Sequence, residues 1–116
     1  MTRTAGESKR GDILRIADIE EVAATIVEIW KAGRERFLAD PILQDALIRR
    51  LEVIGEAAGH ISKAIRDTHP KIPWTKLRGF SSLAKHEYWR VDPVQLWEAA
   101  EAMREIRKGF SRIRFD

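Results

Sequence analysis

The sequence predicts an all-α protein, an up-down bundle of about four main helices. Apolar residues recur at spacings of three and four along most of the chain, and two Asp-Pro pairs mark helix starts. No segment alternates apolar and polar residues as a half-buried strand would. The 116 residues suit one domain with a single core, which we place at residues 12–116.

The first predicted helix follows a polar segment. Residues 1–11 have no apolar face, so we expect a flexible N-terminal arm. From Asp12 the chain becomes amphipathic, with an apolar line through Ile16, Ile19, Ala23, Ile26 and Trp30. Gly33 is expected to end this helix, and residues 34–38 to add a short turn.

Asp40 and Pro41 predict the start of a second long helix, because a carboxylate N-cap precedes a proline at the first helical position. We expect this helix to run to about Thr68. Its predicted core line is Leu43, Leu47, Leu51, Ile54, Ala58, Ile61 and Ile65. Gly55 and Gly59 lie four apart on one face, so another backbone could approach closely there.

Residues 69–74 contain two prolines and are predicted to form a loop. Ile72 and Trp74 are expected to turn inward and pin this loop. His69 is expected to face solvent or to bond the end of the preceding helix. A short extra helix over about residues 81–89 should follow.

Asp92 and Pro93 repeat the helix-start pair, and a last long helix follows them. Its apolar line is Leu96, Trp97, Ala100, Met103 and Ile106. Trp30 and Trp97 lie on apolar lines and are expected in the core. Trp89 is a candidate for a dimer cleft or for base stacking.

The composition limits the function classes. The chain has no cysteine, which excludes disulfides and thiolate zinc sites. No apolar run is long enough to span a membrane, and no signal peptide is visible, so we expect a cytoplasmic protein. The net charge of +3 and a pI near 9.5 are compatible with an anionic partner such as RNA without requiring one.

His86 and Tyr88 are the candidate catalytic pair. An imidazole can give and take protons near neutral pH, and a phenol two residues away can bond a phosphate. A lone histidine in a mixed helix is structural more often than catalytic, so this pattern alone leaves both interpretations open.

Several blocks of the sequence together resemble a known family. They are LEVIGEAA at residues 51–58, HPKIPW at residues 69–74, the stretch from Gly79 to Tyr88, and the pair Val91-Asp92. In this order they are similar to the HepT-like branch of the HEPN superfamily, over about residues 12–110. The resemblance implies an all-helical HEPN bundle that forms a homodimer.

It further implies the toxin half of a prokaryotic toxin–antitoxin pair, a metal-independent endoribonuclease that needs no cofactor. The implied partner is a minimal nucleotidyltransferase, which acts as the antitoxin and can attach AMP to the motif tyrosine. By this resemblance Tyr88 would be the AMP acceptor.

The family's catalytic signature is an arginine, a polar residue, a spacer and then His-x-Tyr. Its histidine and tyrosine match His86 and Tyr88, whereas its arginine falls on Ser81 and its polar residue on Ser82. A serine hydroxyl cannot hold a phosphate as a guanidinium does, so we expect weakened or lost nuclease activity.

Three cations flank the motif and are candidates for binding RNA phosphates: Arg78, Lys85 and Arg90. Arg78 could reach a phosphate, whereas Lys85 points about 100° away from His86 on a helix. The alternative to a ribonuclease is a non-catalytic helical module that binds a nucleotidyltransferase, RNA or nucleotides without cleaving them.

Overall fold

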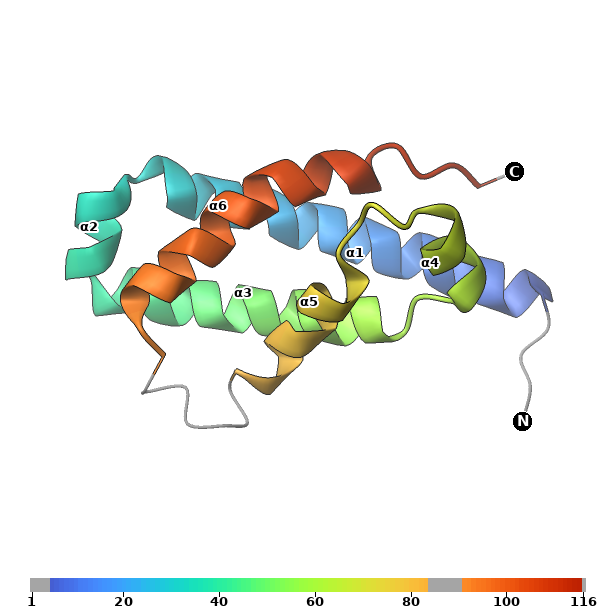
Figure 1. The fold of residues 1–116 in the computed structure, drawn as a ribbon, viewed down its shortest axis with the longest axis horizontal. Helices are drawn as coiled ribbons and strands as arrows, with labels where there is room; N and C mark the ends of the chain where they lie inside the picture. Colours follow the sequence, from blue (N-terminus) through green and yellow to red (C-terminus); the bar gives the residue numbers. More distant parts are fainter. Residues whose placement is uncertain (1–4, 84–90, 116) are drawn as a thin grey trace.

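A computed structural model describes residues 5–83 and 91–115 of the chain, and Figure 1 shows their arrangement. Three long helices are α1 (Ala5–Lys31), α3 (Pro41–Gly59) and α6 (Pro93–Phe110). The short ones are α2 (Arg34–Ala39), α4 (Lys63–Thr68), α5 (Trp74–Gly79) and the 3-10 helix η1 (Phe80–Ser82). The described part measures 47 × 27 × 19 Å.

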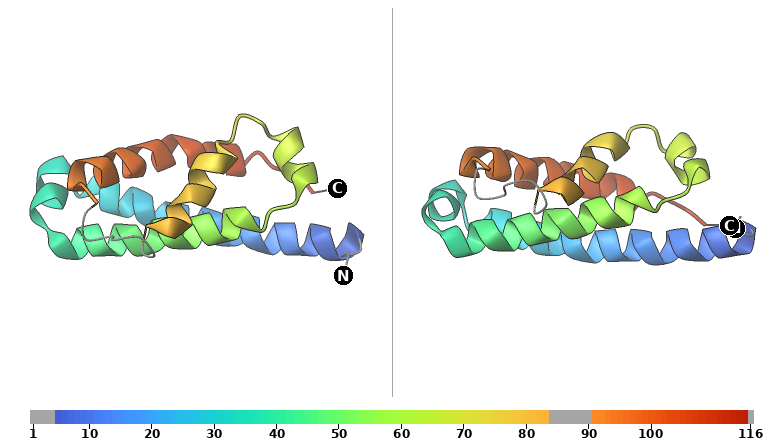
Figure 2. Two further views of the ribbon diagram at one scale, coloured as in Figure 1. Left: turned by 60° about the horizontal axis from the view of Figure 1, so that its bottom comes forward. Right: turned by 90° about the horizontal axis from the view of Figure 1, so that it is seen from below.

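Helix α1 packs against both α3 and α6, which run in the opposite direction to it (Figure 1). Helix α5 and η1 lie against α3, and α4 stands near the start of α1 and the end of α6 (Figure 2). The all-α prediction is confirmed, and the described residues include no strand. None of the described helices is long and apolar enough to cross a membrane.

The apolar lines predicted for the long helices form the core. The fully buried members include Ile19, Ala23, Ile26, Leu47, Leu51, Ile54, Ala100 and Met103. Burying one such leucine or isoleucine contributes roughly 1.5–3 kcal/mol, so this core is the main source of stability. Trp97 is buried and stacks on the half-buried Trp30, with ring centroids 6.4 Å apart, as their positions on apolar lines predicted.

Both predicted Asp-Pro helix starts are confirmed. The Asp40 carboxylate accepts hydrogen bonds from the backbone N–H groups of Ile42 and Leu43, at 2.9 and 3.3 Å. The Asp92 carboxylate accepts one from Val94 N–H at 2.9 Å. Each cap satisfies donors that a helix leaves unpaired at its first turn.

The predicted start of the first helix at Asp12 is wrong, because α1 already begins at Ala5. Residues 5–11, which we expected to be part of a flexible arm, include Ala, Glu, Lys and Arg, which favour helix although Gly6 and Gly11 do not. Asp12 lies inside α1 with only 4% of its surface exposed. Its carboxylate accepts hydrogen bonds from Ser62 N–H at 2.9 Å and from Ser62 Oγ at 2.5 Å.

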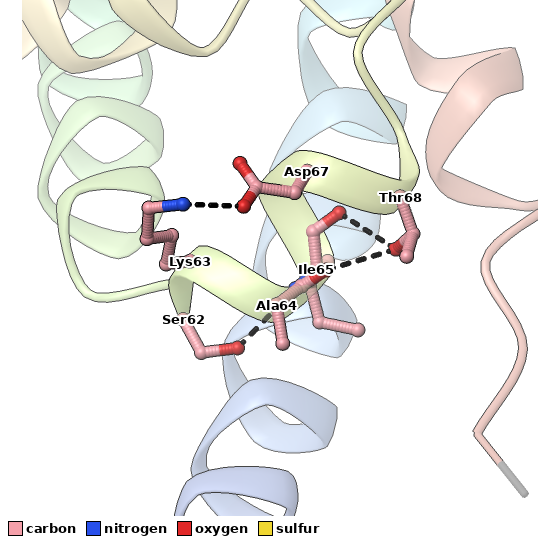
Figure 3. A network of polar contacts seen from close by, with 6 residues as sticks. All are labelled: Ser62, Lys63, Ala64, Ile65, Asp67 and Thr68. Carbon is pink, nitrogen blue, oxygen red and sulfur yellow. Dashed lines mark hydrogen bonds and ion pairs between the residues drawn. The ribbon is translucent and has the colours of Figure 1, made fainter.

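The predicted single helix from Asp40 to Thr68 is divided in two. Helix α3 ends at Gly59, and α4 starts at Lys63 after the N-cap Ser62. Ser62 Oγ accepts a hydrogen bond from Ile65 N–H, which Figure 3 shows. The same hydroxyl donates to the Asp12 carboxylate. A tertiary contact with α1 therefore fixes the point where the chain restarts its helix.

The predicted loop before the motif is shorter than expected. Helix α5 begins at Trp74, directly after Pro73, where the sequence predicted irregular chain. Ile72 and Trp74 are buried, with 6% and 8% of their surfaces exposed, as predicted. The tail after α6 packs back on the bundle through the buried Ile113.

Candidate functional site

The segment that begins the predicted motif sits directly on the backbone of α3 at Gly55. A Cβ atom on Gly55 would lie 2.3 Å from Ser81 N, 2.9 Å from Leu77 O and 3.0 Å from Phe80 C. No side chain other than hydrogen fits such a contact, so Gly55 is needed to seat residue 81. A Cβ on Gly59, the other glycine of the predicted close approach, would meet no atom of another described segment within 4 Å, so Gly59 plays no such part.

Ser81 and Ser82, the residues at the family's arginine and polar positions, lie in η1. Ser81 is half-buried, and its Oγ donates to the Arg78 carbonyl at 2.9 Å. Ser82 is exposed, and its Oγ donates to the Gly79 carbonyl at 2.7 Å. Both hydroxyl protons are thus held by the last turn of α5, and each oxygen keeps only acceptor capacity for a ligand.

Arg78 is the cation nearest in sequence to these serines within the described part of the chain. It is exposed on α5, and its side chain makes no hydrogen bond or ion pair with other described residues. Residues 78 and 81 are three apart in continuous helical backbone, so they are neighbours on one face. A guanidinium is therefore available beside the position where the signature would place one.

The remaining predicted site residues, Lys85, His86, Tyr88 and Arg90, lie outside the described residues, as does Trp89. The structure thus brings together Arg78, Ser81 and Ser82.

His69 bonds the end of the preceding helix, one of the two outcomes expected for it. Its Nδ1 lies 3.1 Å from the Ile65 carbonyl and 3.0 Å from Thr68 Oγ1. Thr68 Oγ1 in turn bonds the carbonyls of Ala64 and Ile65 at the end of α4 (Figure 3). Because a carbonyl can only accept, Nδ1 carries a proton, and in the neutral ring Nε2 is then an acceptor.

Comparison with known proteins decides the family. The profile of the family described as "Ribonuclease HepT-like" matches residues 19–112, which is most of the chain. The chain belongs to this family. The match covers the core helices as well as the predicted motif, so the HepT-like resemblance read from the sequence blocks is confirmed.

Curated relatives agree with this assignment. The chain is 40% identical over 98 residues to "Putative RNase MJ1216" of Methanocaldococcus jannaschii, covering 83% of this chain and 81% of that one. It is 41% identical over 96 residues to "Putative RNase TTE0752" of Caldanaerobacter subterraneus, covering 82% and 86%. It is 34% identical over 101 residues to "Probable ribonuclease HepT" of Thermococcus cleftensis, covering 83% and 92%. No solved structure matches the chain significantly.

Proposed function

We propose that this chain is a metal-independent endoribonuclease whose activity is weakened by the loss of the motif arginine. Family membership and the ribonuclease names of the relatives support RNA as the substrate. Cleavage would use His86 to move a proton between the ribose 2′-hydroxyl and the leaving 5′-oxygen, with Tyr88 orienting the phosphate or the imidazole.

The observation that carries this proposal is the uncharged side chain of Ser81 at the position of the family's arginine. Its backbone is seated by Gly55, but its side chain brings no charge and its proton is donated to the Arg78 carbonyl. The negative charge that develops on the phosphate during cleavage therefore lacks a positive partner at this position. Removing one such electrostatic group typically lowers the rate by about 10²–10³.

The test compares three purified proteins on single-stranded RNA: the unaltered chain, Ser81→Arg and His86→Ala. We expect weak cleavage by the unaltered chain and a cleavage rate about 10²–10³ higher in Ser81→Arg. His86→Ala should not cleave RNA. If the unaltered chain cleaves RNA fast and Ser81→Arg is no faster, then cleavage does not require an arginine at residue 81. Cleavage that survives His86→Ala would remove the proposed proton shuttle.

The weak activity that remains is assigned to Arg78, which lies one turn before Ser81 on an exposed face. Arg78→Gln should lower the residual rate of the unaltered chain further, and lower the rate of Ser81→Arg much less. Equal losses in both backgrounds would instead mean that Arg78 acts separately from the position of Ser81.

In the cell, the protein would be a cytoplasmic toxin that forms a homodimer and is silenced by a minimal nucleotidyltransferase antitoxin. The family resemblance supports this role, with Tyr88 as the AMP acceptor. Co-expression with a minimal nucleotidyltransferase of the kind that the family resemblance implies, followed by mass spectrometry, should show one added AMP on the peptide that contains Tyr88. An unmodified peptide would remove this part of the proposal.

Ser81 also favours a second candidate function, a non-catalytic helical module that binds the nucleotidyltransferase, RNA or nucleotides. The same assay separates the two. If Ser81→Arg cleaves no RNA either, the loss is not confined to one side chain and the non-catalytic function is the better account.

A further inference from the structure

A basic groove lies between the residue 69–73 loop and the end of α6, at the start of α5 and not at the η1 end that carries Ser81. It consists of two adjoining cavities of about 310 and 260 Å³. Both are lined by Lys71, Ile72, Gly109 and Arg112. Thr68 and His69 close one cavity, and Glu105 and Lys108 line the other.

Two of the groove's cations are not engaged within the protein. Lys71 and Arg112 are exposed, and the side chain of neither makes a hydrogen bond or ion pair with another described residue. Lys108, by contrast, is paired with Glu105 at 3.1 Å, which neutralises the one carboxylate in the lining. The groove therefore presents two uncompensated positive charges, which favours an anionic ligand.

The walls of the groove are held in place by contacts within the protein. Ile72 is buried against Gly109, where a Cβ would lie only 3.1 Å from Ile72 Cγ1. Trp74 Nε1 donates to the His69 carbonyl at 3.0 Å, which ties the two ends of the loop together. Its ring meets Phe110 edge-on, with centroids 5.5 Å apart. A preorganised site loses less entropy when it binds.

The polar edge of the groove suits a ribose as well as a phosphate. His69 lines the cavity, and its Nδ1 lies 3.1 Å from the Ile65 carbonyl, so in the tautomer that donates there Nε2 can accept a hydrogen bond. A ribose 2′-hydroxyl is such a donor. The apolar floor at Ile72 and Pro73 can contact a sugar or base face, as sites for single strands do.

A third cavity, of about 380 Å³ between α1 and α3, has a weaker claim to an anion. Its Arg50 already donates to Thr25 Oγ1 at 2.9 Å and to the Ala46 carbonyl at 3.1 Å. Its other cation, Arg36, shares the lining with Glu28. The charge there is thus more fully satisfied than at Lys71 and Arg112.

We propose that the groove of Lys71, Arg112 and His69 binds the sugar-phosphate backbone of single-stranded RNA. This rests on the proposed function and deepens it. Helix α5 joins the groove to Ser81, and its six residues rise by only about 9 Å. An RNA strand bound in the groove can therefore extend along α5 to Ser81. The groove cations would then supply RNA affinity that a serine in place of the arginine does not.

The test measures binding of a fluorescein-labelled single-stranded RNA of mixed sequence by anisotropy, at several salt concentrations, with the full chain. The variant is the double substitution Lys71→Gln and Arg112→Gln. The matched control is Arg34→Gln with Arg36→Gln, which removes the same charge from α2 at the far end of the bundle (Figure 1). All four side chains are exposed, and thermal unfolding verifies that every variant folds.

We expect the groove variant to bind RNA about tenfold more weakly. The slope of the logarithm of the binding constant against the logarithm of the salt concentration should fall in magnitude by about 1.4, because two phosphate contacts at about 0.7 each are lost. In the α2 control, both the RNA affinity and the salt dependence of binding should change much less. The charge-preserving pair Lys71→Arg and Arg112→Lys should keep most of the binding of the unaltered chain.

Equal weakening by the α2 control, or no RNA binding at low salt, would overturn the groove proposal. In the latter case an acidic protein surface becomes the ligand to consider. Failure of the proposed nuclease is distinguishable. If no variant cleaves RNA but binding still depends on Lys71 and Arg112, the groove proposal stands and the ribonuclease proposal falls.

Discussion

Gly55 and Gly109 both make room for the chain around α5, but they meet different parts of it. Gly55 faces backbone atoms of Ser81, Leu77 and Phe80, at 2.3–3.0 Å from an added Cβ. Gly109 faces the side chain of Ile72, at 3.1 Å. A side chain can turn aside, whereas backbone atoms move only with their helix. The motif end of this segment is therefore fixed more firmly than its groove end.

The largest expected effect is that of Gly55→Ala. Alanine favours helix over glycine by about 0.5–1 kcal/mol, but overpacking against backbone costs about 1–3 kcal/mol or more. We expect net destabilisation of about 2 kcal/mol in urea unfolding, and loss of the cleavage that we expect Ser81→Arg to gain.

Gly59→Ala is the matched control for this prediction, because Gly59 lies on the same helix and its added Cβ would meet no atom of another described segment within 4 Å. It should be neutral or stabilising by up to about 1 kcal/mol. Similar losses in the two variants would show that the contact of Gly55 with η1 is not what matters.

Gly109→Ala should have a smaller effect, because the gain in helix preference offsets much of the contact with Ile72. We expect net destabilisation of about 1 kcal/mol or less. In an Ile72→Ala background the added methyl should cost nothing, and a double-mutant cycle measures this coupling. Absence of coupling would mean that the loop is not held against α6 at this point.

Thr68→Val should have the smallest effect. It removes an exposed hydroxyl that bonds the end of α4 and His69, while the Ile65 carbonyl still holds the imidazole. The free energy of unfolding should fall by about 0.5–1.5 kcal/mol at most. RNA affinity should stay within twofold, and a larger loss would show that Thr68 itself contacts the ligand.

Features set by neighbouring residues could be predicted from the sequence. The caps at Asp40 and Asp92 are local, and each carboxylate bonds a backbone N–H two residues on. The start of α4 could not be predicted this way, because Ser62 bonds a carboxylate fifty positions away, on α1. Helix α5 was missed because its N-cap is Pro73, which makes no side-chain cap, whereas α3 and α6 each start with an aspartate cap followed by a proline.

The candidate site was predictable only in part. Resemblance to the family predicted that Ser81 stands at the arginine position, and the structure adds the hydrogen bond from Ser81 Oγ to the Arg78 carbonyl. The basic groove was missed because its two halves are about forty residues apart in the sequence, at Lys71 and Arg112. No helical or strand periodicity relates such positions, so only the packing of the loop on α6 reveals them.

The main-chain seat that Gly55 provides for Ser81 separates position from chemistry. Because the contact involves only backbone, the residue mounted there can be exchanged while its anchorage stays the same. A single substitution at residue 81 would then change the proposed cleavage rate while the packing of the helices stays the same. Evolution would need only one mutation to lower or raise that rate.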